Sequence, residues 1–119
     1  MPILHLVLFR FKLDNNNPAI TSDEQNQQIT SACNSFLELK EKCVNPETME
    51  PYLLDVRGGK DCSPEGIQGG ITHAFVVEFA GESDRDYYLK HDPAHLAFVE
   101  MVGNIVEKVQ VIDFVPGKF

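Results

Sequence analysis

The amino-acid sequence predicts an α+β fold with the ferredoxin-like element order βαββαβ, in which the second helical segment is divided in two. Residues 3–12 and 71–79 are rich in the β-branched and aromatic side chains that favour strands. Residues 21–43 repeat apolar side chains with helical spacing. Right-handed crossovers in this order place the first and third strands side by side at the centre of the sheet.

Length and composition limit the class of protein. The 119 residues correspond to one domain, 1–119, and ten Lys and Arg against eighteen Asp and Glu give a net charge of −8. This negative charge argues against nucleic acid and anionic membranes as partners. No apolar stretch is long enough to cross a membrane, and three cysteines without metal-type spacing are typical of a reduced, cytoplasmic protein.

The first predicted strand, residues 3–12, is apolar on both faces, as a central strand is. One face presents Ile3, His5, Val7, Phe9 and Phe11, and the other presents Leu4, Leu6 and Leu8. We expect helices to cover one face and a partner sheet to cover the other.

The first predicted helix begins at a capping box, in which Thr21 and Glu24 would each satisfy a backbone N–H of the first turn. An apolar stripe follows and lasts until about Cys43. The stripe consists of Ile29, Ala32, Cys33, Phe36 and Leu37. Cys33 is most simply a small core residue.

Two further strands are predicted at 52–58 and 71–79, separated by a loop that begins at Gly58 and Gly59. These glycines match no phosphate-binding pattern, so turn formation explains them better. In the strand 71–79, His73 and Phe75 share one face with Val77 and Phe79.

The last third of the chain predicts two helices and a final strand. Ser83 can cap a short helix that ends near Lys90, and Asp92 with Pro93 opens a second helix over about 93–106. Residues 109–115 form the closing strand.

Histidines are the strongest candidates for chemistry. His5, His73 and His95 lie on the faces that a helix and two central strands would bring together, and His91 ends the short helix. An apolar pocket would keep an imidazole neutral, as a general base requires. Hydrogen-bonded structural histidines are the alternative. Tyr87 or Tyr88 could donate a hydrogen bond into the same pocket.

A metal site is not expected. His91 and His95 are four residues apart, but Asp92 and Pro93 interrupt the helix between them, and no metal-binding motif accompanies them.

Four segments together resemble the stress-responsive dimeric α/β-barrel (Dabb) family. They are residues 1–12 with His5, residues 71–79 with His73, the run YLKHDPAH over 88–95, and VIDF over 111–114. The resemblance covers nearly the whole chain. It implies a protomer whose sheet packs on a second copy to form a closed barrel, so that a homodimer would cover the face of Leu4, Leu6 and Leu8.

The family includes polyketide cyclases of the olivetolic acid cyclase type, which use neither metal nor organic cofactor. Similarity to them implies that His95 is the base and Tyr88 the tyrosine that holds the substrate. It further implies pocket histidines at His5 and His73, and pocket walls at Val7, Phe9 and Phe75. Asp92 is an extra residue between His91 and Pro93, so Tyr87 is the alternative tyrosine.

The leading hypothesis is therefore a homodimer that binds a small apolar carbonyl or polyketide-like compound and acts as a cofactor-independent cyclase or lyase. The alternative is a non-catalytic stress-response protein or ligand carrier. A cofactor-independent monooxygenase is a further alternative.

Overall fold

The computed structural model describes residues 1–13 and 22–119, which form a four-stranded sheet with the order β2-β3-β1-β4. The strands are β1 (Ile3–Phe11), β2 (Asp55–Lys60), β3 (His73–Phe79) and β4 (Val106–Phe114). Every neighbouring pair is antiparallel, and β1 and β3 are central, as predicted. The sheet thus presents two broad faces for packing.

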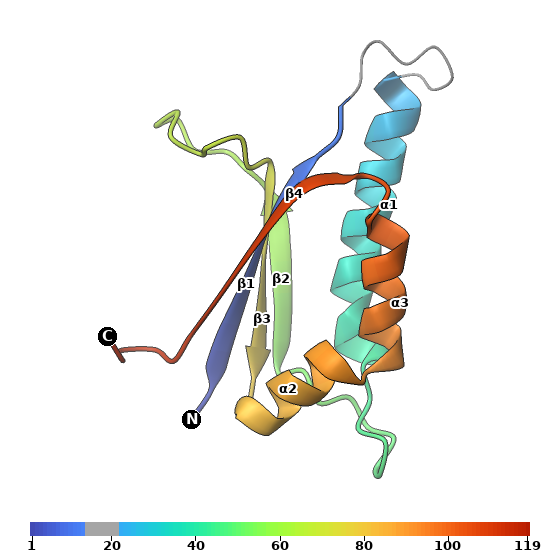
Figure 1. The fold of residues 1–119 in the computed structure, drawn as a ribbon, viewed down its shortest axis with the longest axis vertical. Helices are drawn as coiled ribbons and strands as arrows, with labels where there is room; N and C mark the ends of the chain where they lie inside the picture. The colour runs from blue at the N-terminus through green and yellow to red at the C-terminus, as the bar shows by residue number, and fades with distance from the viewer. Residues whose placement is uncertain (14–21) are drawn as a thin grey trace.

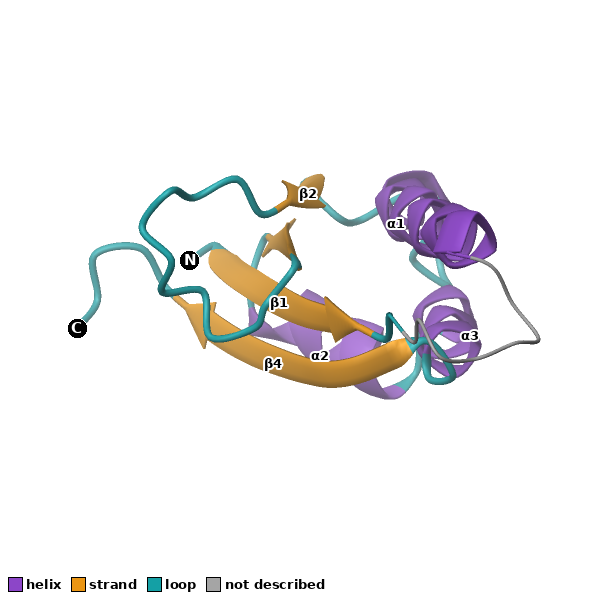
Figure 2. Cartoon of the chain, turned by 90° about the horizontal axis from the view of Figure 1, so that it is seen from above, coloured by secondary structure: helices purple, strands orange, loops and turns teal. Residues whose placement is uncertain are grey.

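Three helices cover one face of the sheet (Figures 1 and 2). They are α1 (Ser22–Lys42), α2 (Glu82–Lys90) and α3 (Pro93–Val102). The order of elements confirms the ferredoxin-like α+β fold with its divided second helical segment. The loop between β2 and β3 projects away from the helices (Figure 1). None of the helices in residues 22–119 is long and apolar enough to cross a membrane.

An aromatic core fills the space between helices and sheet. Phe36 of α1 stacks on Phe75 of β3 with ring centroids 4.2 Å apart, and Phe9 and Phe98 meet the ring of Phe36 edge-on. Aromatic pairs in these geometries add to the free energy gained by burial. Cys33 is partly buried and packs against this core, which agrees with its prediction as a core residue.

The second strand differs from the prediction. It begins at Asp55 and extends to Lys60, so Gly58 and Gly59 lie in β2 and not in the loop. Gly58 faces Phe75 on β3, and a Cβ atom at position 58 would lie 2.0 Å from the phenyl ring. Glycine is therefore required because the aromatic ring occupies the space of a side chain.

Helix ends also differ from the predictions. α2 begins at Glu82 without a side-chain cap, so the proposed cap by Ser83 is wrong. α3 ends at Val102, because Val106 pairs with Phe11 and already belongs to β4. Asp92 caps α3 as predicted. Thr21, one half of the predicted capping box, lies outside the described residues.

The helix-free face of the sheet carries an apolar cluster at one end, and Arg10 and Lys108 lie at the other end. Leu4 and Leu6 of β1 pair with Phe114 and Ile112 of β4 on this face. Both leucines are half-buried, whereas Ile112 is 57% exposed and Phe114 is 40% exposed. An apolar surface of this kind is typical of an interface with another molecule.

Candidate functional site

A cavity of about 320 Å³ lies between the sheet and α3, on the helix-covered face. Its walls are apolar, with His5, Tyr88 and His95 as the residues that can form directed hydrogen bonds. Strand alternation explains the arrangement, because residues 5, 7 and 9 of β1 and residues 109 and 111 of β4 all point to this face. The apolar walls include Val7, Phe9, Phe98, Val99, Val109 and Val111.

His95 is the third residue of α3 and is held by the preceding helix. Its Nδ1 atom lies 2.9 Å from the backbone carbonyl oxygen of Tyr88. A carbonyl can only accept, so Nδ1 carries the proton and Nε2 keeps its lone pair in the neutral ring. Burial lowers the pKa of His95, and this effect outweighs the hydrogen bond to Tyr88, which raises the pKa. The ring is therefore neutral at pH 7.

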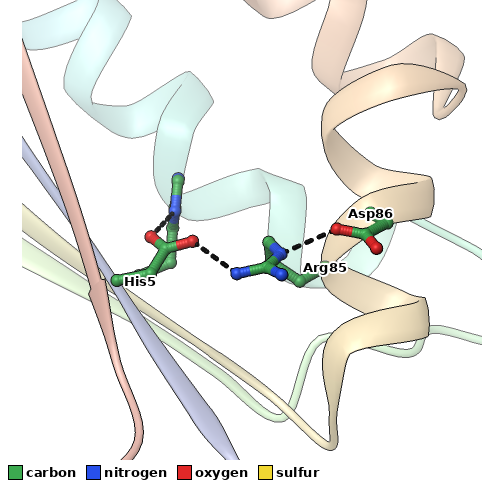
Figure 3. Close-up of polar contacts among 4 residues, drawn as sticks. His5, Arg85 and Asp86 are labelled. Atoms are coloured by element: carbon green, nitrogen blue, oxygen red, sulfur yellow. Dashed lines mark hydrogen bonds and ion pairs between the residues drawn. The ribbon is translucent and has the colours of Figure 1, made fainter.

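His5 is anchored by a chain of charged side chains (Figure 3). Its Nδ1 atom lies 2.6 Å from one carboxylate oxygen of Asp113, its direct neighbour on β4. The other oxygen of Asp113 accepts a hydrogen bond from Arg85 at 3.0 Å, and Arg85 also contacts Asp86 at 2.9 Å. Because Asp113 engages Nδ1, Nε2 is the nitrogen of His5 that a ligand can meet.

Tyr88 lies between the two histidines. Its ring stacks on His95 at a centroid distance of 3.8 Å and meets His5 edge-on at 5.9 Å. The residue is fully buried, and its hydroxyl has no hydrogen-bond partner among the described residues. Burial raises the pKa of Tyr88, so the phenol stays protonated. Buried polar groups are nearly always paired, so this unpaired hydroxyl is a candidate donor, and because protein atoms cover it, it reaches a bound molecule only after a movement of the ring.

The structure does not bring His73 into this cavity. In the antiparallel register, Val77 faces His5, whereas His73 faces Phe9 near the other end of β1. The ring of His73 packs edge-on against Phe11 at 5.0 Å. We expected three histidines in one pocket, but only His5 and His95 of these three line the cavity.

Three other candidates also lie outside the cavity lining. Tyr87 packs against Tyr52 and His91, and His91 is exposed. Consecutive residues of a helix point about 100° apart, so Tyr88 faces the sheet and Tyr87 does not. Phe75 is buried in the core behind the cavity, stacked on Phe36. Val7 and Phe9 do line it, as the resemblance implied.

Asp113 and Arg85 were not among the residues predicted for the site. Alternation along the last strand places Asp113 on the same face as the cavity residues of β4. Its pairing with His5 depends on strand register, which the sequence pattern alone does not determine. Within residues 1–13 and 22–119, no three His, Cys, Asp or Glu side chains are placed to share a metal ion.

Comparison with protein families decides the classification. The model of the stress responsive A/B barrel domain, Dabb, matches residues 3–116. The chain belongs to the Dabb family. Olivetolic acid cyclase from Cannabis sativa is 28% identical to this Dabb protein over 118 residues, which are 99% of this chain and 100% of the cyclase. A stress-response A/B barrel domain-containing protein, HS1, from Arabidopsis thaliana is 38% identical over 58 residues, covering 49% of this chain and 52% of that protein.

Solved structures share the Dabb fold. A crystal structure of an Arabidopsis thaliana protein matches with a TM-score of 0.74 and 26% identity, covering 98% of this chain and 97% of that one. Hydroxynitrile lyase from Passiflora edulis matches with a TM-score of 0.73 and 21% identity over 99% and 96% of the two chains. A Thermobifida fusca protein, described as dimeric and ferredoxin-like, has a TM-score of 0.64 and 23% identity over 97% and 91%.

Proposed function

We propose that this Dabb protein binds a small apolar carbonyl compound in the cavity and that His95 acts there as a general base. The observation that carries the proposal is the hydrogen bond from His95 Nδ1 to the Tyr88 carbonyl. That bond leaves Nε2 as the nitrogen that can take a proton from a ligand. The lowered pKa of His95 keeps this nitrogen free at neutral pH.

An intramolecular aldol cyclisation fits these groups. His95 Nε2 takes a proton from a carbon between two carbonyl groups, and the resulting enolate carbon forms a bond to another carbonyl carbon of the same molecule. The alkoxide produced takes a proton back from the imidazolium. After a movement that uncovers its buried hydroxyl, Tyr88 donates a hydrogen bond to the enolate oxygen, and His5 orients a second oxygen. The same steps in reverse cleave a carbon–carbon bond, as a lyase does.

The comparisons support a cyclase in preference to other activities. The relative that matches along its whole length is named a cyclase. The similarity to hydroxynitrile lyase is a similarity of fold. Cleavage of a carbon–carbon bond by the same groups is therefore the second candidate reaction. Apolar walls supply what a polyketide-like ligand needs, namely a surface on which an extended chain can fold so that its reacting carbons meet.

We infer that the protein acts as a homodimer formed through the helix-free face of the sheet. Half-buried Leu6 and 57% exposed Ile112 on this face would be covered by the second copy. Structural neighbours from Bacteroides fragilis and Thermobifida fusca are described as dimeric. All three cysteines are free thiols, which supports a reducing compartment such as the cytoplasm.

Turnover of a linear poly-β-ketone by wild type and by His95→Gln tests the proposed function. The glutamine amide of this variant can still donate to the Tyr88 carbonyl, so the helix junction is preserved while the base is lost. We expect turnover to fall at least about 10²-fold with ligand affinity nearly unchanged, since a single general base contributes about 10²–10⁴-fold. Binding without turnover in the wild type would indicate a carrier, and oxygen uptake during turnover would indicate a monooxygenase.

A further inference from the structure

Asp92 is a buried carboxylate close to the candidate site, and the proposed reaction does not use it. The residue is only 1% exposed at the junction of α2 and α3. One carboxylate oxygen accepts the backbone N–H of Ala94 at 2.9 Å, and the other accepts the hydroxyl proton of Tyr52. A carboxylate away from water is unfavourable unless it is bonded in this way. The buried thiol of Cys43 is a third partner, and together these bonds fix Asp92 in one position.

These bonds connect the base helix to a different part of the chain. Ala94 directly precedes His95, whereas Tyr52 belongs to the segment before β2. The backbone N–H of Asp92 also donates to the carbonyl oxygen of Tyr87 at 3.0 Å, which ties the junction to α2. The hydrogen bond between His95 and the Tyr88 carbonyl spans the same junction. Movement of Asp92 would therefore displace the ring of His95 relative to α2.

Charged groups near this junction also shift the pKa of His95. The ring of Tyr88 from α2 stacks on the ring of His95, and the titratable groups whose charge acts on His95 are His5 from β1 and Asp92 from the junction. The negative charge of Asp92 raises the pKa of His95, against the larger lowering by burial, while His5 lowers it. Tyr52 has a raised pKa, mainly because of its burial, and stays neutral beside Asp92.

We propose that Asp92 and Tyr52 form a positioning pair for His95. The proposal rests on the function proposed above and adds to it: the pair holds the α2–α3 junction so that Nδ1 stays on the Tyr88 carbonyl and Nε2 stays free. Neither residue touches the ligand. Their effect on the reaction passes entirely through the orientation and the charge environment of the imidazole.

Nitrogen-15 NMR of His95 in the resting protein tests this role without a substrate. In Asp92→Asn the cap on α3 is retained, because Asn is as good an N-cap as Asp, but the charge is lost. We expect the pKa of His95 to fall. In Tyr52→Phe the carboxylate loses its bond from Tyr52 and keeps those from Ala94 and the buried Cys43 thiol, and we expect the ring of His95 to shift from the Nδ1–H tautomer to a mixture with the Nε2–H tautomer. Glu100→Gln removes an exposed charge from α3 and is the matched control, with wild-type behaviour expected.

Steady-state kinetics with a linear carbonyl compound that the protein cyclises supply the second readout. Both variants should lower kcat by about tenfold with little change in KM, because small misplacements of a catalytic group cost up to about 10²-fold in rate. An unchanged pKa and tautomer in both variants would overturn the positioning role. If Asp92→Asn fails to fold, the tautomer in Tyr52→Phe decides. If the wild type turns over no carbonyl compound, the proposed function fails, whereas the NMR results still decide for or against the pair.

Discussion

His5 and Asp113 face each other on neighbouring strands, with Nδ1 of the imidazole 2.6 Å from a carboxylate oxygen. His5 is 2% exposed, and the second carboxylate oxygen of Asp113 accepts a hydrogen bond from Arg85 of α2. A polar chain thus crosses from the centre of the sheet to a helix that packs beside the cavity. It fixes one of the two histidines in the cavity wall, as the Tyr88 carbonyl fixes the other.

Removal of Asp113 should weaken the fold. In Asp113→Ala the buried Nδ1 of His5 loses its partner, and a group left in this state costs about 1–3 kcal/mol in the free energy of unfolding. Chemical denaturation measures the loss. Asp55→Ala is the control, because its partner Arg57 is largely exposed and such ion pairs contribute about 0–1 kcal/mol. Equal losses in the two variants would contradict a structural role for the His5–Asp113 pair.

Filling the cavity mouth should block ligand binding without unfolding the protein. Val99 lines the cavity and is 48% exposed, so Val99→Phe can extend across the opening. We expect the affinity for an apolar carbonyl probe to fall at least about tenfold, measured by isothermal titration calorimetry, with stability within about 0.5 kcal/mol. Leu96→Phe, on the same helix but outside the lining, should bind as the wild type does. Similar affinity for all three proteins would place the ligand elsewhere.

Two adjacent glycines of β2 should respond differently to alanine. A Cβ at Gly58 would lie 2.0 Å from the ring of Phe75, whereas a Cβ at Gly59 would meet nothing within 4 Å. Gly58→Ala forces the aromatic core to shift, and overpacking of this kind costs about 1–3 kcal/mol in the free energy of unfolding. Gly59→Ala should be neutral or stabilising. Thermal denaturation compares them, and equal stability would show that Phe75 moves freely.

Acid should destabilise the protein through its histidines. Burial lowers the pKa values of His73 and His95 below the ordinary value of 6.5. The unfolded chain therefore binds protons more readily than the folded one. The contribution of these two histidines to the free energy of unfolding is fully present above pH 6.5 and is lost as the pH falls below this value. Urea denaturation between pH 5 and pH 8 measures the slope. His95→Gln should flatten it in part, and a slope of the opposite sign would contradict the buried, neutral imidazoles.

The dimer should dissociate when charge is placed on the helix-free face. Ile112 is 57% exposed in the protomer, so Ile112→Glu leaves the core intact and disrupts the contact between copies. Equilibrium sedimentation at micromolar concentration should give a dimer for the wild type and a monomer for this variant. Leu37→Glu, on the partly exposed surface of α1, should remain dimeric. A monomeric wild type would contradict the proposed homodimer.

The sequence was sufficient for the order of elements because alternation and helical spacing are local signals. β1, for example, carries alternating buried residues from Ile3 to Phe11, and Asp92 and Pro93 mark the start of α3. Gly58 misled the prediction, because a glycine that makes room for an aromatic ring looks like a glycine in a turn.

The site was only partly predictable because it depends on register. Alternation placed His5 and His73 on one face, but antiparallel pairing sets Val77 beside His5 and moves His73 to Phe9. The same register brings Asp113 to His5, a contact between residues 108 positions apart in the sequence. No local pattern encodes such a pairing.

Exchange of the acidic α-hydrogens of an apolar 1,3-dicarbonyl probe in D₂O tests most directly whether His95 is a base in this cavity. NMR follows the exchange with catalytic amounts of wild type or His95→Gln. The wild type should accelerate exchange over buffer, and the variant should lose at least about 10²-fold of that acceleration while binding the probe. Equal acceleration by the two proteins, or none by the wild type, would contradict the account.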